Sequence, residues 1–278
     1  MSSKLRIRFT DHLTVLRKAP KTKEAYLRAV GGLADYYRHP PDRLRNEQIQ
    51  EYLRYLIEDR KLSWSSCNVA FSGLVCFYRG FLGWPETRFS IPPRPRIRQL
   101  PRIMSVAEVR KIIDASPNLK HQALLKTVYC AGLRVSEVVR LKPQHIESDP
   151  SRMLIRVEQG KGHKDRYTVL TTDCLETLRG YWLAYRPEQW LFPGARASQS
   201  MSISAAQRIY EDAKKKAGVI HGRGIHTLRH CFATHRLHQG TDIFVLQRLL
   251  GHTDIKTTIQ YLHLTPDRIA SLKSPLGQ

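Results

Sequence analysis

Apolar side chains recur every three or four residues along much of this chain, a spacing that predicts helices. In the first third, three such stripes predict helices over residues 22–37, from Asn46 onward and from Ser63 onward, with a shorter helix near 11–17 as a fourth. Asn46 is expected to cap its helix. The stripes consist of Tyr26, Ala29, Val30, Leu33 and Tyr37; Ile49, Tyr52, Leu53, Leu56 and Ile57; and Val69, Leu74, Phe77 and Phe81. Residues 1–90 are therefore expected to form a small helical bundle.

The pattern changes in the second part of the chain, where two strand-like runs interrupt the helices. Ser105 and Glu108 have the spacing of a capping box, so a helix is expected to begin there. The runs 153–157 and 167–170 predict a β-hairpin, because the turn between them is rich in glycine and lysine. Further helices are expected over 119–130, from Val135, over 172–185 and over 203–217. The fold class predicted is mainly α with a small β-hairpin or sheet.

A proline-rich segment separates the two parts. Residues 91–102 hold four prolines and four arginines, which is incompatible with a regular helix or strand. We expect an extended basic linker, which serves as a spacer between domains and can also lie along a phosphate backbone. The predicted organisation is a helical domain at 1–90, the linker at 91–102 and a second domain at 103–278.

The net charge of the chain indicates what kind of molecule it binds. The chain holds 46 Lys and Arg against 24 Asp and Glu, a net charge of +22. The excess is spread over the chain, since residues 1–100 carry 19 − 9 = +10 and the rest carries 27 − 15 = +12. Such a surplus favours a polyanion, and nucleic acid is the usual one. The alternative, a membrane surface, would call for a cationic amphipathic helix or a lipidation motif, and the sequence has neither.

Cysteine usage and the N-terminus bear on the compartment. The five cysteines, an odd number, are widely spread and form no Cys-x-x-Cys pair, which suits buried thiols in a reducing cytosol. The chain shows no signal peptide and no apolar run long enough to span a bilayer. We expect a cytoplasmic protein.

A group of reactive residues lies between His226 and Tyr261. His226 and Arg229 are three residues apart and share a helix face, while Arg134, at a turn into a helix, can supply a second guanidinium. Two guanidiniums can hold the non-bridging oxygens of a phosphodiester and stabilise its pentacoordinate transition state. Tyr261 is then the expected nucleophile, provided that a cationic pocket makes its phenol reactive.

Two more residues complete the predicted chemistry. His252, like His226, can hydrogen-bond the same oxygens or assist proton transfer, and Lys161, in the hairpin turn, can protonate the leaving oxygen. No metal is expected, because the histidines near residue 230 come without His-Glu-x-x-His or a carboxylate cluster. No phosphate-binding Gly-x-x-x-x-Gly-Lys-Ser/Thr is present, so ATP is not implied.

Basic residues outside this group are candidates for DNA contact. Lys164 and Arg166 belong to the predicted hairpin turn, which can enter a groove. The alternative is an ordinary solvated hairpin, which would need neither the two glycines nor the three cations of this turn. Arg94, Arg96 and Arg98 belong to the linker.

The ordered motifs resemble those of the tyrosine recombinases, the phage-integrase family, and are most similar to its simple Xer-like members. Ala131-Gly-Leu-Arg-Val-Ser-Glu137 resembles the family's first box and Gly160-Lys-Gly-His-Lys-Asp-Arg166 its hairpin, with Lys161, in preference to Lys164, at the catalytic lysine. His226-Thr-Leu-Arg229, Leu250-Gly-His252 and Tyr261 resemble the remaining boxes. Leu262 departs from the small polar residue that is frequent there. The helical segment 1–90 then resembles the family's core-binding, DNA-binding domain, and 103–278 its catalytic domain. The resemblance also implies association with the bacterial nucleoid when the protein is active.

The resemblance implies a mechanism and an assembly. Tyr261 would attack the scissile phosphate and form a 3′-phosphotyrosyl link, and the 5′-hydroxyl of a partner strand would then attack that link, with no cofactor. Strand exchange would pass through a Holliday junction, within a homo-tetramer on paired double-stranded DNA sites. A helical segment at 267–272 would dock on a neighbouring protomer. No arm-binding domain or long insertion is evident, so a compact recombinase is expected.

Two alternatives remain open at the level of sequence. A type IB topoisomerase would use the same chemistry to relax supercoils without exchanging strands. A non-catalytic DNA-binding protein could keep the scaffold, although the full reactive set argues against it.

Overall fold

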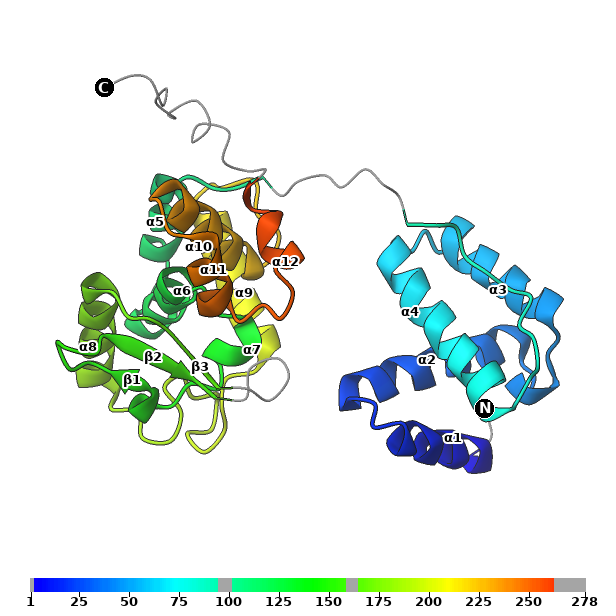
Figure 1. Ribbon diagram of the computed structural model, residues 1–278. Coiled ribbons are helices and arrows are strands. Elements are labelled where there is room, and N and C mark those ends of the chain that lie inside the picture. Colours follow the sequence, from blue (N-terminus) through cyan, green and yellow to red (C-terminus); the bar gives the residue numbers. More distant parts are fainter. Residues whose placement is uncertain (1–2, 95–101, 159–164, 263–278) are drawn as a thin grey trace, which may run out of the picture. The chain divides into compact units, whose positions relative to one another are not determined.

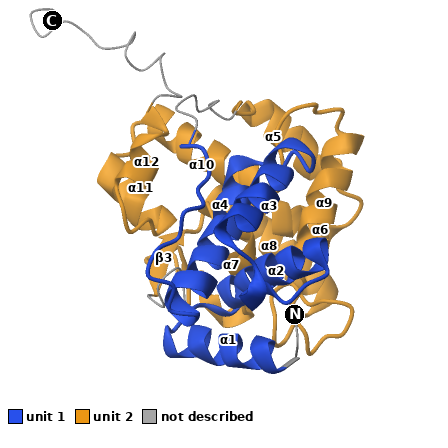
Figure 2. Cartoon of the chain, turned by 90° about the vertical axis from the view of Figure 1, so that its right-hand side faces the viewer, with its two compact units in different colours: residues 1–98 blue, residues 99–278 orange. Residues whose placement is uncertain are grey.

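The computed structural model describes residues 3–94, 102–158 and 165–262, and it divides the chain into two compact units, 1–98 and 99–278 (Figure 2). The division falls inside the predicted linker. Each unit has a hydrophobic core of its own. No helix of the described residues is long and apolar enough to cross a membrane.

Unit 1 is a helical bundle, as the apolar stripes predict (Figure 1). Phe9, Val30, Leu53, Leu74 and Phe77 are all fully buried in its core. The first helix begins well before the predicted 11–17, and the third stripe is divided between an α-helix and a π-helical turn. The elements are α1 (Ser3–Val15), α2 (Pro20–Tyr37), a 3₁₀ turn (Pro41–Arg43), α3 (Asn46–Glu58), α4 (Trp64–Val75) and the π turn (Cys76–Phe81).

Two details of the sequence prediction for unit 1 were wrong. Asn46 does not cap α3: it is the first residue of the helix, after the N-cap Arg45, and its Oδ1 accepts a hydrogen bond from the backbone N of Arg88 at 3.0 Å. Val69 is 42% exposed, because α4 turns it away from the core that receives Leu74. Ser63 does cap α4, by accepting a hydrogen bond from the backbone N of Ser66.

Unit 2 combines helices with a small antiparallel sheet, so the fold class predicted is confirmed (Figure 1). The sheet has the order β1-β2-β3, with Ile146 opposite Ile155 and Ile155 opposite Thr168. The elements are α5 (Val106–Asp114), α6 (Leu119–Ala131), α7 (Val135–Val138), a 3₁₀ turn (Pro143–His145), β1 (Ile146–Glu147), β2 (Leu154–Val157), β3 (Arg166–Val169), α8 (Thr172–Tyr185), α9 (Ile203–Lys216), α10 (His226–His238), α11 (Ile243–Leu250) and α12 (Lys256–Ile259).

The hairpin β2–β3 was predicted to within one residue at each end. Its outer partner β1 is only two residues long, too short for a periodic pattern to reveal. β3 packs against both α6 and α11, and α10 packs against α6. The sheet, α6, α10 and α11 therefore bring segments from residue 131 to residue 261 into contact.

The turn after α6 depends on Gly132. This residue ends the helix with φ of +61°, and a Cβ built there would lie 2.3 Å from Cδ1 of Phe232 on α10. Its carbonyl oxygen accepts a hydrogen bond from Nη1 of Arg229. Only glycine combines the left-handed conformation with so close an approach of α10.

We expect Gly132→Ala to lower the free energy of unfolding by about 2 kcal/mol or more, from left-handed strain and the clash with Phe232. Gly180→Ala is the matched control, since Gly180 lies exposed in α8 with nothing within 4 Å of a built Cβ. It should raise that free energy by about 0.5–1 kcal/mol. Urea unfolding of both variants is the measurement, and equal effects would contradict this account of Gly132.

Candidate active site

Five of the six residues predicted to be catalytic lie in one connected cluster of unit 2. Arg134 precedes α7, and His226 and Arg229 occupy the first turn of α10. His252 follows the glycine that ends α11, and Tyr261 lies two residues after α12. Figure 1 shows α10, α11 and α12 grouped on one side of the unit. Lys161 lies outside the described residues.

The centre of the cluster is a buried carboxylate, that of Glu137. Its two oxygens accept hydrogen bonds from Arg166 at 2.9 and 2.8 Å, in a bidentate pair. Arg134 donates to it from Nη1 at 2.7 Å and from its backbone N at 2.8 Å, and Nη1 of Arg229 lies 3.8 Å from Oε2. Burial alone would raise the pKa of Glu137, but Arg166 and Arg134 outweigh it and lower that pKa to about 2.

The same three arginines also hold the end of α11. Nε of Arg166 donates to the carbonyl oxygen of Leu249 at 3.0 Å, and Nη2 of Arg229 donates to that of Leu250 at 2.7 Å. Nη2 of Arg134 donates to that of Gly251 at 3.2 Å. The last carbonyls of a helix lack partners within the helix and carry its negative end, so they suit guanidinium donors.

Arg229 is the most enclosed member, with a side chain only 1% exposed. Desolvation, together with the charge of Arg134, lowers its pKa to about 9, so it remains protonated at neutral pH. Its Nη2 lies 3.0 Å from Nε2 of His252. Because a guanidinium only donates, Nε2 of His252 accepts, and its Nδ1 donates to Oγ1 of Thr258 at 2.9 Å.

Both predicted catalytic histidines are neutral in this arrangement. Burial, followed by the charge of Arg229, lowers the pKa of His252 to about 3. The His226 residue is exposed, but part of its ring is desolvated. This desolvation, followed by the neighbouring His230 and Arg229, lowers the pKa of His226 to about 4. An anion bound between these rings would oppose both shifts and favour their charged forms.

Tyr261 is buried, with 5% of its surface exposed, and its phenol oxygen lies 2.9 Å from Nδ1 of His230. Its ring is stacked against that of His252, at 6.4 Å between centroids. Sequence reasoning expected cationic neighbours to make this phenol reactive. Arg229 and Arg134 do act to lower its pKa, but burial is the larger effect, and the pKa of Tyr261 is raised.

The predicted DNA-contacting residues are placed differently from one another. Arg166 is the first residue of β3, and its side chain is only 11% exposed and paired with Glu137. Arg94 is exposed, with its guanidinium 5.6 Å from the centre of the Trp64 ring. Lys164, Arg96 and Arg98 lie outside the described residues.

Sequence reasoning missed three members of the cluster: Glu137, His230 and Thr258. Glu137 has a local signal, because it is three residues beyond Arg134 at the start of a helix, where a carboxylate caps the backbone N. His230 and Thr258 have no such signal. Their partners are 31 and 6 residues away along the chain.

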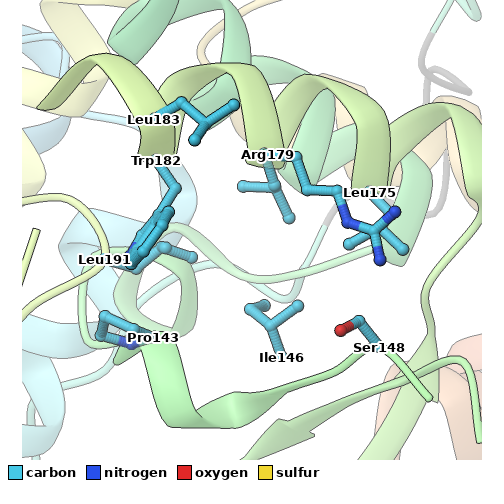
Figure 3. A pocket seen from close by; sticks show the side chains of 9 residues that line it. Pro143, Ile146, Ser148, Leu175, Arg179, Trp182, Leu183 and Leu191 are labelled. Carbon is cyan, nitrogen blue, oxygen red and sulfur yellow. The ribbon is translucent and has the colours of Figure 1, made fainter. Parts of the chain in front are cut away.

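A separate cavity of about 400 Å³ lies away from this cluster (Figure 3). Leu175, Arg179, Trp182 and Leu183 of α8 line one side of it, and Pro143, Ile146 and Ser148 line the other. It contains none of the predicted catalytic residues. The described part of the chain holds no group of three or more His, Cys, Asp or Glu side chains arranged to bind a metal ion.

Comparison with known proteins agrees with the geometry. The family described as phage integrase matches residues 99–268, and the phage integrase N-terminal SAM-like domain matches residues 5–86. A Sinorhizobium fredii sequence with the provisional description integrase/recombinase is 39% identical over 98% of this chain and 88% of its own length. The tyrosine recombinase XerD of Caulobacter vibrioides is 31% identical over 84% of this chain and 82% of its own.

Solved structures show the same fold. The XerA recombinase is 28% identical over 96% of this chain and 95% of its own, with a TM-score of 0.55. A λ integrase fragment, solved as a dimer bound to a core site, is 19% identical over 100% of this chain and 99% of its own, with a TM-score of 0.73. With its motifs, fold and relatives in agreement, this chain belongs to the phage integrase family of tyrosine recombinases.

Proposed function

We propose that this site-specific DNA recombinase cleaves and rejoins DNA with Tyr261 as nucleophile and the surrounding cluster as its phosphate pocket. The observation that carries the assignment is the arrangement around Tyr261. Arg134, Arg229 and His252, from three separate segments, join in one hydrogen-bonded network beside its ring. Such a concentration of donors favours the charge that grows on the non-bridging oxygens.

In the proposed steps, each bond to phosphorus that breaks is replaced by a new one. The Oη–P bond of a 3′-phosphotyrosyl link forms while the bond to the 5′ oxygen breaks, and that oxygen takes a proton from Lys161. A 5′-hydroxyl of the partner strand then attacks the link, forms the new phosphodiester and releases Tyr261. The energy of the first bond is kept in the link, so the reaction needs no cofactor.

The side chain of Arg229 is only 1% exposed, and its Nη2 donates to Nε2 of His252. If the phosphate binds this nitrogen, a phosphate oxygen takes the place of His252 as the acceptor. His252 accepts from Arg229 here, so its Nε2 must carry a proton, through protonation of the ring or a change of tautomer, before it can donate to the phosphate. Phosphate binding is therefore expected to be coupled to a change in the protonation or tautomer of His252.

The active assembly is proposed to be a homo-tetramer on two DNA sites, with a Holliday junction between the two strand exchanges. The net charge of +22, spread through both parts of the sequence, supports an extensive contact with DNA phosphates. The protein is proposed to act in the cytoplasm, on the nucleoid. The predicted docking segment at 267–272 lies outside the described residues.

We expect Tyr261→Phe to abolish a covalent DNA adduct while leaving DNA affinity within about a factor of three, because only the nucleophilic oxygen is lost. The substrate is a duplex with the inverted repeats that flank the gene, nicked beside the predicted cleavage position. The adduct is measured on denaturing gels and affinity by fluorescence anisotropy. No adduct with the unmodified chain would support a non-catalytic DNA-binding protein, and relaxation of supercoiled plasmid without recombinants would support a topoisomerase.

A second experiment distinguishes a residue that stabilises the site from a residue that contacts DNA. Arg166→Ala should lower the free energy of unfolding by up to about 3 kcal/mol, since it removes the bidentate partner of buried Glu137. It should not change the salt dependence of binding to random-sequence duplex. Arg94→Ala is the comparison, and should reduce the slope of log affinity against log salt by about 0.9 if Arg94 contacts one phosphate. A reduced slope for Arg166→Ala would identify Arg166 as a DNA contact instead.

A further inference from the structure

His230 is the group that holds the phenol of Tyr261. Its Nδ1 lies 2.9 Å from Oη of Tyr261, and the planes of the two rings meet at 48°. It follows Arg229 directly and lies one helical turn after His226, whose ring is 4.8 Å away and nearly perpendicular. This contact joins the predicted nucleophile to a side chain with a titratable nitrogen.

The charges that face His230 keep its ring neutral. Burial, followed by the charge of Arg229, lowers the pKa of His230. Among the described residues, the titratable rings in contact with it are His226 on the same helix and Tyr261, which is itself stacked on His252. A neutral imidazole with its proton on Nε2 leaves a lone pair on Nδ1, which can accept the hydrogen of the phenol.

Tyr261 needs such an acceptor. Its pKa is raised by burial, so at neutral pH it carries a proton that must leave when Oη attacks phosphorus. Glu137 cannot serve, because its oxygens are engaged by Arg166 and Arg134. His252 cannot serve in this arrangement, because its Nε2 accepts from Arg229 and its Nδ1 donates to Thr258.

We propose that His230 is a catalytic residue, the general base that takes the proton of Tyr261 during cleavage and returns it during rejoining. This inference rests on the proposed role of Tyr261. The Oη–H proton passes to Nδ1 as the Oη–P bond forms, the P–O5′ bond breaks, and the departing 5′ oxygen takes its proton from Lys161. Rejoining reverses each transfer.

The weak basicity of His230 becomes an advantage in this scheme. Without DNA, Arg229 and burial oppose an imidazolium, so the phenol remains protonated and unreactive. A phosphate in the pocket adds negative charge beside the same ring, and the transition state adds more. Proton transfer therefore becomes favourable only when the scissile phosphate is in place.

The test compares His230→Asn with His235→Asn. Asparagine can keep an acceptor near the position of Nδ1 but cannot take the proton. His235 is a matched control on the same helix, since its Nδ1 lies 2.8 Å from Oη of Tyr129, away from the predicted catalytic residues. The rate of covalent adduct formation is measured under single-turnover conditions with the nicked inverted-repeat duplex, and unfolding free energies are measured for both variants.

His230→Asn should slow cleavage at pH 7 by about 10² or more, with unchanged DNA affinity, and its rate should rise about tenfold per pH unit. His235→Asn should cleave at the rate of the unmodified chain. A duplex with sulfur at the bridging 5′ position, whose leaving group needs no proton, should restore Lys161→Ala but not His230→Asn. The proposal would be overturned if His230→Asn cleaved DNA at a near-normal or higher rate, or if the sulfur substrate restored cleavage by this variant.

A measurement without DNA tests the same assignment independently. Nitrogen NMR of the histidine-labelled full chain should show His230 with a proton on Nε2 and an unprotonated, hydrogen-bonded Nδ1 at pH 7. A proton on Nδ1 would overturn the proposal whatever the kinetics. If the proposed function itself is wrong, the unmodified chain forms no covalent adduct at all, and this result distinguishes that case from a wrong assignment of His230.

Discussion

The buried carboxylate of Glu137 is the constraint on which the catalytic region depends. Three arginines of like charge lie close together in a place that water hardly reaches, an arrangement that costs free energy unless a negative group offsets it. Glu137 supplies that charge and joins the segments before α7, at the start of β3 and in α10. The carboxylate thus brings side chains from three separate segments of the chain together.

The cluster is arranged as the proposed phosphate pocket requires. The three guanidiniums donate to Glu137 and to the carbonyls that end α11, so neighbouring groups of the fold fix their positions. Preorganised donors of this kind need little rearrangement when charge develops on a substrate. In the proposed mechanism the cost falls on His252, which accepts from Arg229 here and would have to become a donor.

Much of this arrangement could be predicted from the sequence. The mainly helical class and the hairpin have local signals in the periodicity of apolar residues. The motifs with Arg134, Arg229, His252 and Tyr261 are weak one by one and become specific only as an ordered set. Asn46, Val69 and the extent of α1 were misjudged, because a cap or a buried face is decided by what packs nearby: Arg88 claims the side chain of Asn46. Arg166 was predicted to contact DNA from a hairpin tip, yet its side chain is turned towards Glu137, a direction that no sequence pattern encodes. The pairing of His230 with Tyr261 spans 31 residues and depends on how α10 and the segment after α12 meet.

The three carbonyls at the end of α11 have a consequence for how this region tolerates change. The place of His252 is set by guanidiniums from elsewhere in the fold, through Leu249, Leu250 and Gly251, and not by the connection that leads from α10 into α11. That connection runs over the surface at residues 239–242, where Gly240 has open space around it. Changes in the length of this exposed connection are therefore expected to leave the position of the histidine unchanged, whereas its composition is restricted by Gly240, with φ of +91°, and by Asp242, which caps α11.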